Sequence, residues 1–449
     1  MTIPESIGDL FTTPAMSALF SPEAHVRQML HFEAALARAE ARAGVIPAPA
    51  AQAIGAACQV EHFDVSALYR EAIVAGTPAI PLVRQLTASV DGEARKYVHW
   101  GATSQDAIDT ALMLQMRAGL DLLITGVEAI CATCAELAER HRRTVMAGRT
   151  LLQQALPITF GLKAARWLAL FTRQLRALRE QRQRSLAVQF GGAAGTLAAL
   201  GEHGLQIMQL LAEELTLPEG DLPWHTERDR ITVIASTLGI LAGSLDKLAS
   251  DLVLLAQTEV GEVREADLPG KGGSSAMPQK HNQVDAIRAR AAARLALGLV
   301  PVLFSAMSQE QERAAGAWQA EWSALPQLFC HTACAVESVR QAVAGLQIDE
   351  ARMRANLALS GGLLMAEALT MALASHLGRA EAHRLVTALC ARAVASGQDL
   401  HEIALATPEV SAHLSISDIS SALDPANYLG SSESLIERAL ASYRTAQLE

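Results

Sequence analysis

One regular run of apolar residues constrains the fold of this 449-residue chain more than any other feature. Between positions 231 and 255, isoleucine and leucine recur at alternating spacings of three and four residues. This period is typical of the buried seam of a long helix that packs against other long helices. We expect a helix of about 35 residues, roughly 50 Å long. Its seam consists of Ile231, Ile234, Leu238, Leu241, Leu245, Leu248, Leu252 and Leu255.

Thr226, followed three residues later by Asp229, predicts a capping box at the start of this helix.

This helix is one of five long helices joined by short connections, a pattern that predicts a helical bundle. Helices of this length expose more apolar surface than one chain can cover, which favours self-association. The other four are predicted at residues 107–142, 157–186, 284–311 and 321–346.

Composition agrees with a helical interior, because half of the residues are hydrophobic and only 4% are aromatic. An amphipathic helix at 23–43, ending at Gly44, precedes the bundle, and shorter helices interrupted by glycine and proline follow it. No segment keeps the alternation of a strand. We therefore predict an all-α fold with three helical domains, at residues 1–106, 107–346 and 347–449.

The net charge of −10 has the wrong sign for a nucleic-acid-binding protein. Residues 1–10 lack the pattern of a signal peptide, and the longest near-apolar run, 295–307, contains Pro301 and is too short to span a membrane. We expect a cytoplasmic protein that has neither nucleic acid nor a membrane as partner, in which a few local cations meet any anionic ligand.

Two cysteine clusters raise the alternative of a zinc site: Cys131 with Cys134, and Cys330 with His331 and Cys334. Both clusters lie inside helical patterns without flanking turns, where cysteines are ordinary core residues. We therefore predict no metal.

Three polar segments interrupt the long helices. In residues 99–106, Thr103 and Asp106 occupy capping positions, and the amides of such a turn can hold a carboxylate. Segment 99–106 could also be a helix cap without any other role. The second segment, 148–154, could be a simple connection between helices.

The third segment, 269–282, combines glycines with serine, lysine and asparagine. Ordering so much glycine costs entropy, which a loop that closes over a ligand repays.

At these three segments the chain resembles the fumarase/aspartase superfamily. Residues 273–282 match its GSSxMPxKxN motif, and residues 99–106 match its HxGxTSxD segment. The likeness covers essentially the whole chain, including residues 191–196. It implies a homotetramer whose core contains 20 helices, five from each subunit, with every active site shared between three subunits.

The resemblance also implies elimination or addition beside a carboxylate, through a carbanion and without a cofactor. Ser274 matches the family's catalytic base, and Lys280 and Asn282 match the pair that stabilises the anion. A serine hydroxyl is a weak base unless its anion is stabilised. The matching substrate-binding positions are His99, Thr103, Ser104, Thr150 and Gln153.

Two positions differ from the family's usual residues and limit which reaction the chain can catalyse. Many members carry a histidine at the position of Leu151 and a glutamate at that of Ile287, and this pair protonates the leaving group. A carboxylate leaves without a proton, because its pKa is about 4. The chain therefore resembles the branch in which a carboxylate of a small polycarboxylate adds within the molecule to form a lactone. Arg228 and Arg313 are the candidates for pairing with its other carboxylates.

Two other readings remain: the first is adenylosuccinate lyase or another fumarase-type lyase, and the second is an inactive scaffold. The adenylosuccinate lyase branch has a similar overall pattern, but Trp318 and Trp322 stand where its serine and arginine clamp a phosphate. The second reading is an inactive helical scaffold descended from the family. The intact Ser274, Lys280 and Asn282 argue against the scaffold.

Overall fold

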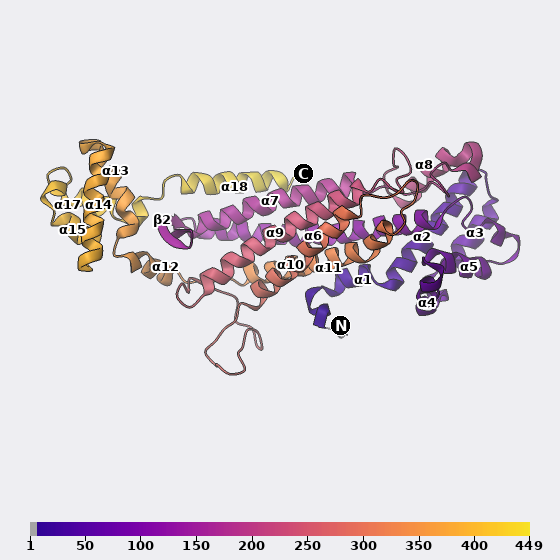
Figure 1. Ribbon diagram of the computed structural model, residues 1–449, viewed down its shortest axis with the longest axis horizontal. Helices are drawn as coiled ribbons and strands as arrows, with labels where there is room; N and C mark the ends of the chain where they lie inside the picture. The colour runs from indigo at the N-terminus through magenta and orange to yellow at the C-terminus, as the bar shows by residue number, and fades with distance from the viewer. Residues whose placement is uncertain (1–6) are drawn as a thin grey trace. The chain divides into compact units, whose positions relative to one another are not determined.

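The computed structural model describes residues 7–449, so the first six residues of the N-terminal segment lie outside it. The fold is all-α, as predicted, and its main elements are five long helices (Figure 1). These are α6 (Ser104–Arg140), α7 (Phe160–Arg184), α9 (Asp229–Ala256), α10 (Val284–Ser305) and α11 (Ala317–Ala344).

Helix α9 carries the predicted seam. All eight seam residues are buried, and the most exposed of them, Leu255, shows 5% of its surface. The helix is shorter than predicted, with 28 residues. The capping box at Thr226 is wrong, because the Thr226 hydroxyl instead donates to the carbonyl oxygen of Gln311 at 2.8 Å, and α9 begins only at Asp229.

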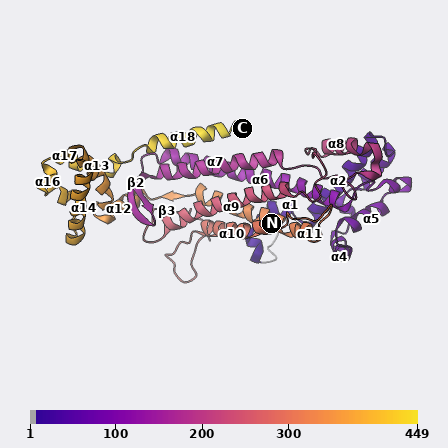
Figure 2. The same cartoon turned by 45° about the horizontal axis from the view of Figure 1, so that its top comes forward.

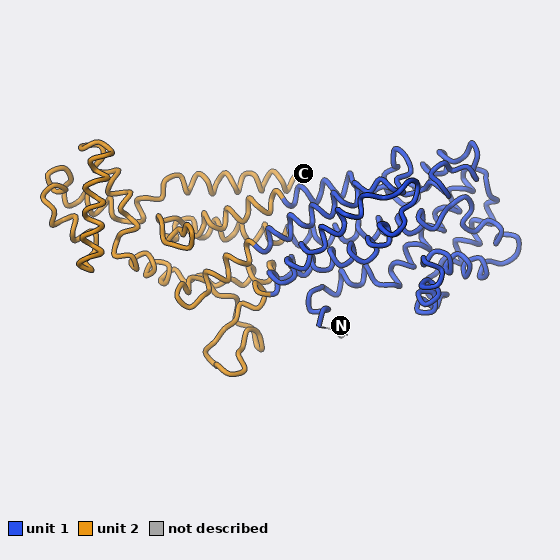
Figure 3. The backbone as a smooth tube through the Cα atoms, viewed as in Figure 1, with its two compact units in different colours: residues 1–127, 174–246, 288–338 blue, residues 128–173, 247–287, 339–449 orange. Residues whose placement is uncertain are grey.

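Contacts divide the chain into two compact units, each made of three separate segments (Figure 3). Unit 1 comprises residues 1–127, 174–246 and 288–338, and unit 2 comprises residues 128–173, 247–287 and 339–449. The segments alternate because each of the five long helices runs from one unit into the other. The three-domain boundaries taken from the sequence remain a prediction.

Unit 1 contains the shorter N-terminal helices and α8. Ser21 caps α2, since its hydroxyl accepts from the amide of Ala24 at 3.1 Å, and Gly44 follows the end of α2 with a positive φ, as its place in the sequence predicted. The helices are α1 (Pro14–Leu19), α2 (Pro22–Arg42), α3 (Ala48–Ala57), α4 (Val65–Ala75), α5 (Ala79–Ser89) and α8 (Gly204–Leu215).

The C-terminal part of unit 2 is a group of short helices with its own apolar core. Gly378 and Gly397 end α13 and α14 at positive φ, which glycine adopts without strain. The helices are α12 (Glu350–Leu357), α13 (Ala366–Leu377), α14 (Arg379–Ser396), α15 (Leu400–Leu405), α16 (Pro408–Ser411), α17 (Ile416–Ala422) and α18 (Ser432–Ala446).

The sequence did not predict the two short antiparallel sheets of unit 2. Strand β1 (Val145–Thr150) pairs with β2 (Gln153–Thr159), and β3 (Val263–Arg264) pairs with β4 (Gln347–Ile348). The helix predicted from Pro157 therefore begins later. Pro157 lies in β2 opposite Ala147, and α7 starts at Phe160.

Helix α6 is long and apolar enough, by length and composition alone, to cross a membrane, a property that the core helix of a helical bundle shares. Its first turns carry polar side chains that are fully buried in unit 1, namely Gln105, Asp106, Asp109 and Thr110. Cys131 and Cys134 are buried core residues of the same helix. Within residues 7–449, no group of His, Cys, Asp and Glu side chains is placed to hold a metal ion.

Candidate active site

The first polar segment is organised by the buried carboxylate of Asp106. One of its oxygens accepts from the amides of Thr103 at 3.0 Å and Gly192 at 2.9 Å. The other accepts from the amide of Gly191 at 3.0 Å and pairs with Nε2 of His225 at 2.8 Å. The predicted cap is therefore present, and the same carboxylate also fixes the glycine turn at 191–192.

Thr103 and Ser104 lie at the start of α6 and are partly buried. His99 precedes them with a φ of 57°, a left-handed conformation that is uncommon outside glycine. Backbone strain of this kind clusters at functional sites, where the surroundings hold it in place. The segment therefore presents three of the predicted substrate-binding residues on a fixed turn.

His99 is oriented by Glu33 of α2, which the sequence analysis missed. Nδ1 of His99 lies 2.6 Å from Oε1 of Glu33, whose side chain is 1% exposed. Burial lowers the pKa of His99, but the charge and hydrogen bond of Glu33 outweigh burial, so the net pKa is raised. With Nδ1 engaged, Nε2 is the nitrogen left to meet a substrate carboxylate.

A second acidic residue of α2, Glu40, is buried in unit 1. It is fully buried, and neither carboxyl oxygen has a hydrogen-bond partner within residues 7–449. Burial, helped by the charge of Glu33, raises the pKa of Glu40 to about 9. Glu40 is therefore neutral at neutral pH.

Arg228 is buried between two carboxylates. Its NH1 and NH2 groups donate to Asp109 of α6 at 2.7 and 3.1 Å. Its NH2 and Nε groups donate to Glu321 of α11 at 2.5 and 3.1 Å, and the side chain is 0% exposed. The guanidinium is thus occupied within the protein. The expectation that Arg228 pairs with a substrate carboxylate does not fit these surroundings, and a positioning role does.

Arg313 is placed differently, because it is exposed. Its Nε donates to the side-chain oxygen of Gln105 at 3.1 Å, and its terminal amino groups have no partner in the described part of the chain. Gln105 is in turn fixed by Asp109 and by the carbonyl oxygen of His225. Arg313 is therefore a supported cation that remains open to an anionic ligand.

Trp318 and Trp322 pack against each other beside Asp109. Trp318 is buried, and its Nε1 donates to Asp109 at 2.9 Å. Trp322 packs edge-on against it, with ring centroids 4.7 Å apart. This packing fills the two positions where the adenylosuccinate lyase pattern needs a phosphate clamp.

The second polar segment is the turn of the β1–β2 hairpin. Thr150 and Gln153 form the closing pair, and Leu151 and Leu152 form a two-residue turn with φ values of 50° and 64°. Such a turn normally contains Asn and Gly, because both positions are left-handed. The leucines are 96% and 78% exposed. A strained turn that presents apolar side chains is typical of a segment with a partner to contact.

Buried pairing holds the base of this hairpin. Arg149 donates both terminal amino groups to the fully buried Glu262, at 2.9 and 2.7 Å. Asn356 of α12 also donates to Glu262 at 2.8 Å, and its carbonyl oxygen accepts from the side chain of Gln154 at 2.7 Å.

The third polar segment is an exposed loop that extends from unit 2 between β3 and α10 (Figure 2). Ser274 Oγ accepts from the amide of Met277 at 3.1 Å and from that of Ala276 at 3.4 Å. Two amides directed at one oxygen stabilise a negative charge on it. A serine that acts as a base needs this stabilisation.

The base of the loop is closed by a second network. Lys271 bridges Glu265, at 3.2 Å, and Asp285. Glu265 also accepts from the amides of Asp285 and Ala286, the first turn of α10, and its own amide donates to the side chain of Gln283 at 2.9 Å. Glu262 and Glu265 flank β3, so this short strand supports both the hairpin and the loop.

Lys280 and Asn282, the anion-stabilising pair predicted in the loop, differ in their exposure and contacts. Lys280 is exposed, and its ammonium group has no partner within residues 7–449. Asn282 is partly buried, and its side chain donates to the carbonyl oxygen of Gly272 at 3.1 Å. The Asn282 side chain must give up this hydrogen bond before it can bind a substrate. The Lys280 ammonium group has no such bond to give up within the described part of the chain.

The predicted residues thus fall into two groups. Unit 1 holds His99, Thr103, Ser104, Arg228 and Arg313, and unit 2 holds Thr150, Gln153, Ser274, Lys280 and Asn282. Glu33, Asp109, Glu262 and Glu265 are supporting residues that sequence reasoning missed, because single acidic residues in helical or short extended segments carry no motif.

An all-α chain with these motif-bearing turns has the features of a fumarase-type lyase. The family model described as Lyase matches residues 10–298, and that described as Adenylosuccinate lyase C-terminus matches residues 362–439. The chain belongs to the fumarase/aspartase superfamily of lyases.

Three known proteins are similar to this chain over almost its whole length. It is 49% identical to the 3-carboxy-cis,cis-muconate cycloisomerase of Pseudomonas aeruginosa over 98% of this chain and 96% of the relative. It is 48% identical to that of Bradyrhizobium diazoefficiens, over 97% of each chain. The crystal structure of the 3-carboxy-cis,cis-muconate lactonizing enzyme from Pseudomonas putida superposes with a TM-score of 0.95, at 46% identity, covering 99% of this chain and 100% of that one.

Glu33→Gln is expected to lower the pKa of His99, because the neutral amide removes the charge that favours the imidazolium. The native pair stabilises the folded state fully below the ordinary histidine pKa and loses this effect as pH rises through the raised value. The variant should therefore lose roughly 1.5–3 kcal/mol of stability near pH 6 and less near pH 9. Titration of His99 by NMR and urea unfolding at both pH values measure these effects.

Glu61→Gln is the matched control, because Glu61 is largely exposed and lies 3.8 Å from Arg27. It should leave both measurements unchanged. An unaltered His99 titration in Glu33→Gln would contradict the assigned role of Glu33.

Replacing Leu151 and Leu152 by Asn and Gly is expected to stabilise the hairpin, because these residues adopt the left-handed turn with less strain. Exchange of the β1–β2 amides should slow by roughly five- to thirtyfold, as measured by hydrogen exchange. Leu359→Asn, at another exposed leucine of unit 2 without a positive φ, should leave this exchange unchanged. Faster exchange in the double variant would show that the leucines do not strain the turn.

Proposed function

We propose that this chain is a 3-carboxy-cis,cis-muconate cycloisomerase, which interconverts 3-carboxy-cis,cis-muconate and 4-carboxymuconolactone without a cofactor in the cytoplasm. The observation that carries the proposal is the 49% identity to a cycloisomerase of that name over 98% of the chain. The reaction belongs to the breakdown of protocatechuate. The intact Ser274, Lys280 and Asn282 support an active enzyme rather than an inactive scaffold.

In the lactonising direction, a carboxylate oxygen of the substrate forms a bond to a carbon of its own diene. The electron pair moves to the carbon beside another carboxylate, giving a carbanion that spreads into that carboxylate. The Ser274 hydroxyl then transfers its proton to this carbon. Intramolecular attack needs a substrate held in a folded shape, and fixed donors supply that positioning.

The contacts of Ser274 support its role in both directions. After proton transfer its oxygen is an alkoxide, and the amides of Ala276 and Met277 are placed to donate to it. In the reverse direction this alkoxide removes the carbon proton. Lys280, with no partner within residues 7–449, is the cation available for the developing aci-carboxylate.

The remaining carboxylates of the substrate need other donors. Nε2 of His99 and the terminal amino groups of Arg313 are open to them, and Thr103, Ser104, Thr150 and Gln153 supply polar side chains. Leu151 stands where a leaving-group acid would be, which suits a carboxylate that leaves without a proton. Adenylosuccinate lyase activity is disfavoured, because Trp318 is buried and bound to Asp109.

The active enzyme is, in this proposal, a homotetramer whose 20-helix core joins segments from three subunits at each site. Apolar side chains seven residues apart remain exposed along two bundle helices. They are Val233 and Ile240 on α9, with Ile240 61% exposed, and Leu295 and Val302 on α10. Such stripes are what a neighbouring helix covers in a coiled-coil-like core.

Ser274→Ala is expected to abolish lactonisation, with a loss of at least about 10³-fold in kcat, while leaving the helical content unchanged, because the loop is exposed. The reaction is followed by the ultraviolet loss of the conjugated diene. Ser275→Ala changes the neighbouring exposed serine of the same loop and should cost far less. Adenylosuccinate offered in parallel should not react; if only adenylosuccinate reacts, the proposed substrate is wrong.

Shared sites predict that two inactive variants complement each other. His99→Ala and Ser274→Ala, coexpressed, should regain activity, because some sites of a mixed tetramer combine an intact His99 segment with an intact Ser274 loop. The matched control pairs Ser274→Ala with Lys280→Ala, whose defects lie on one loop, so that no site is repaired. Activity and sedimentation velocity are measured on purified mixed oligomers. Equal activity of the two mixtures would argue against sites shared between subunits.

A further inference from the structure

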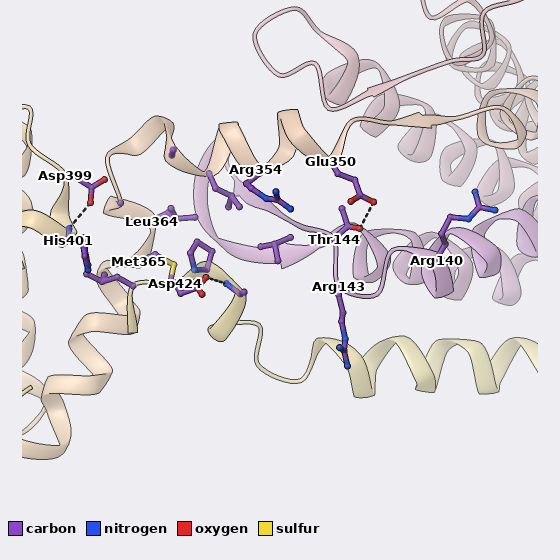
Figure 4. A pocket seen from close by; sticks show the side chains of 17 residues that line it. Arg140, Arg143, Thr144, Glu350, Arg354, Leu364, Met365, Asp399, His401 and Asp424 are labelled. Atoms are coloured by element: carbon purple, nitrogen blue, oxygen red, sulfur yellow. Dashed lines mark hydrogen bonds between the residues drawn. The ribbon is translucent and has the colours of Figure 1, made fainter. Parts of the chain in front are cut away.

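A cavity of about 740 Å³ lies within unit 2 (Figure 4). Its walls come from the end of α6, the start of β1, α12, and the segments around α15 and the 3-10 turn Pro425–Asn427. None of the ten site residues predicted from the sequence lines it. Its volume falls in the range that holds small organic ligands.

The wall of the cavity is apolar over much of its extent. An apolar surface of this kind favours a ligand with a hydrocarbon body, since burying that body removes it from water. The apolar lining consists of Val145, Leu357, Ala358, Leu364, Met365, Leu423, Pro425 and Ala426.

Two of the three arginines that line the cavity are unpaired in the described part of the chain. Among the arginines, Arg140 pairs with Glu136, whereas Arg143 and Arg354 have no partner within residues 7–449. In Figure 4 the Arg354 side chain extends from α12 among the other lining side chains, whereas the Arg143 side chain points away from them.

Each acidic group of the lining already accepts a hydrogen bond. Asp399 accepts from the amide of His401 at 2.8 Å, and Asp424 accepts from that of Ala426 at 2.9 Å. Glu350 accepts from the Thr144 hydroxyl at 3.1 Å. The guanidinium group of Arg354 has no partner within residues 7–449 and can bind a carboxylate through paired hydrogen bonds.

We propose that this cavity binds a small carboxylate with an apolar body, which lies among the apolar side chains while its carboxylate pairs with Arg354. Its elements also support the hairpin. Thr144 and Val145 lead into β1, and α12 carries Asn356, which contacts Gln154 of β2. An occupied cavity therefore stiffens the hairpin that presents Thr150 and Gln153. This regulatory consequence rests on the proposed function, whereas binding itself does not.

Benzoate is the probe, titrated into the full-length protein by isothermal calorimetry. Benzoate should bind, while benzamide, which lacks the charge, and acetate, which lacks the ring, should bind much more weakly. Arg354→Met should weaken benzoate binding by roughly ten- to hundredfold, the effect of losing a charge-assisted hydrogen bond. Arg354 is exposed, so the variant should fold and keep its lactonising activity. Arg438→Met, at an exposed arginine of α18 outside the cavity, is the matched control and should bind as the native protein does.

Hydrogen exchange of β1 and β2 should slow when benzoate is added to the native protein and stay unchanged in Arg354→Met. Three results overturn the proposal: no benzoate binding by the native protein, equal binding by Arg354→Met, or displacement of benzoate by the muconate substrate in simple competition. Benzoate binding through Arg354 in a protein that does not lactonise 3-carboxymuconate would refute the proposed function and leave this site standing.

Discussion

The buried guanidinium of Arg228 is the interaction on which the arrangement of unit 1 depends. It joins Asp109 of α6 to Glu321 of α11, just before the first residue of α9. Removing one partner from a buried pair leaves an uncompensated charge, which costs about 3–5 kcal/mol. Apolar seams allow helices to slide by a turn, but a planar group held by two carboxylates does not. The cluster therefore sets the register in which α6, α9 and α11 meet.

Buried ion pairs also position segments of unit 2. Strand β3 is only two residues long, yet the acidic residues on either side of it hold two exposed segments. Glu262 fixes the hairpin through Arg149, and Glu265 fixes the loop through Lys271 and the start of α10. The exposed tips are thus free to carry strained or polar residues, because their bases are anchored by buried charge.

The helical architecture was largely readable from the sequence, because the seam of α9 repeats over eight residues and every one of them is buried. The hairpin was not, since its two strands are short and its turn contains Leu151 and Leu152 in place of the usual Asn and Gly. The motifs located Ser274, His99 and their neighbours. They did not reveal that Arg228 is occupied, because its partners lie 119 and 93 residues away in the chain. Partners of buried charges are set by packing, which spacing does not record.

Because of Glu40, the folding of unit 1 is coupled to the uptake of a proton. An exposed glutamate in the unfolded chain is ionised at neutral pH, whereas the buried carboxyl of Glu40, with a pKa of about 9, is protonated. Between about pH 4.5 and pH 9 the folded state therefore holds one more proton than the unfolded state, and this group's effect on stability becomes less favourable as pH rises. Folding of a newly made chain therefore consumes a proton in this range. Alkaline solution accordingly works against its refolding even when every apolar contact of the bundle is intact.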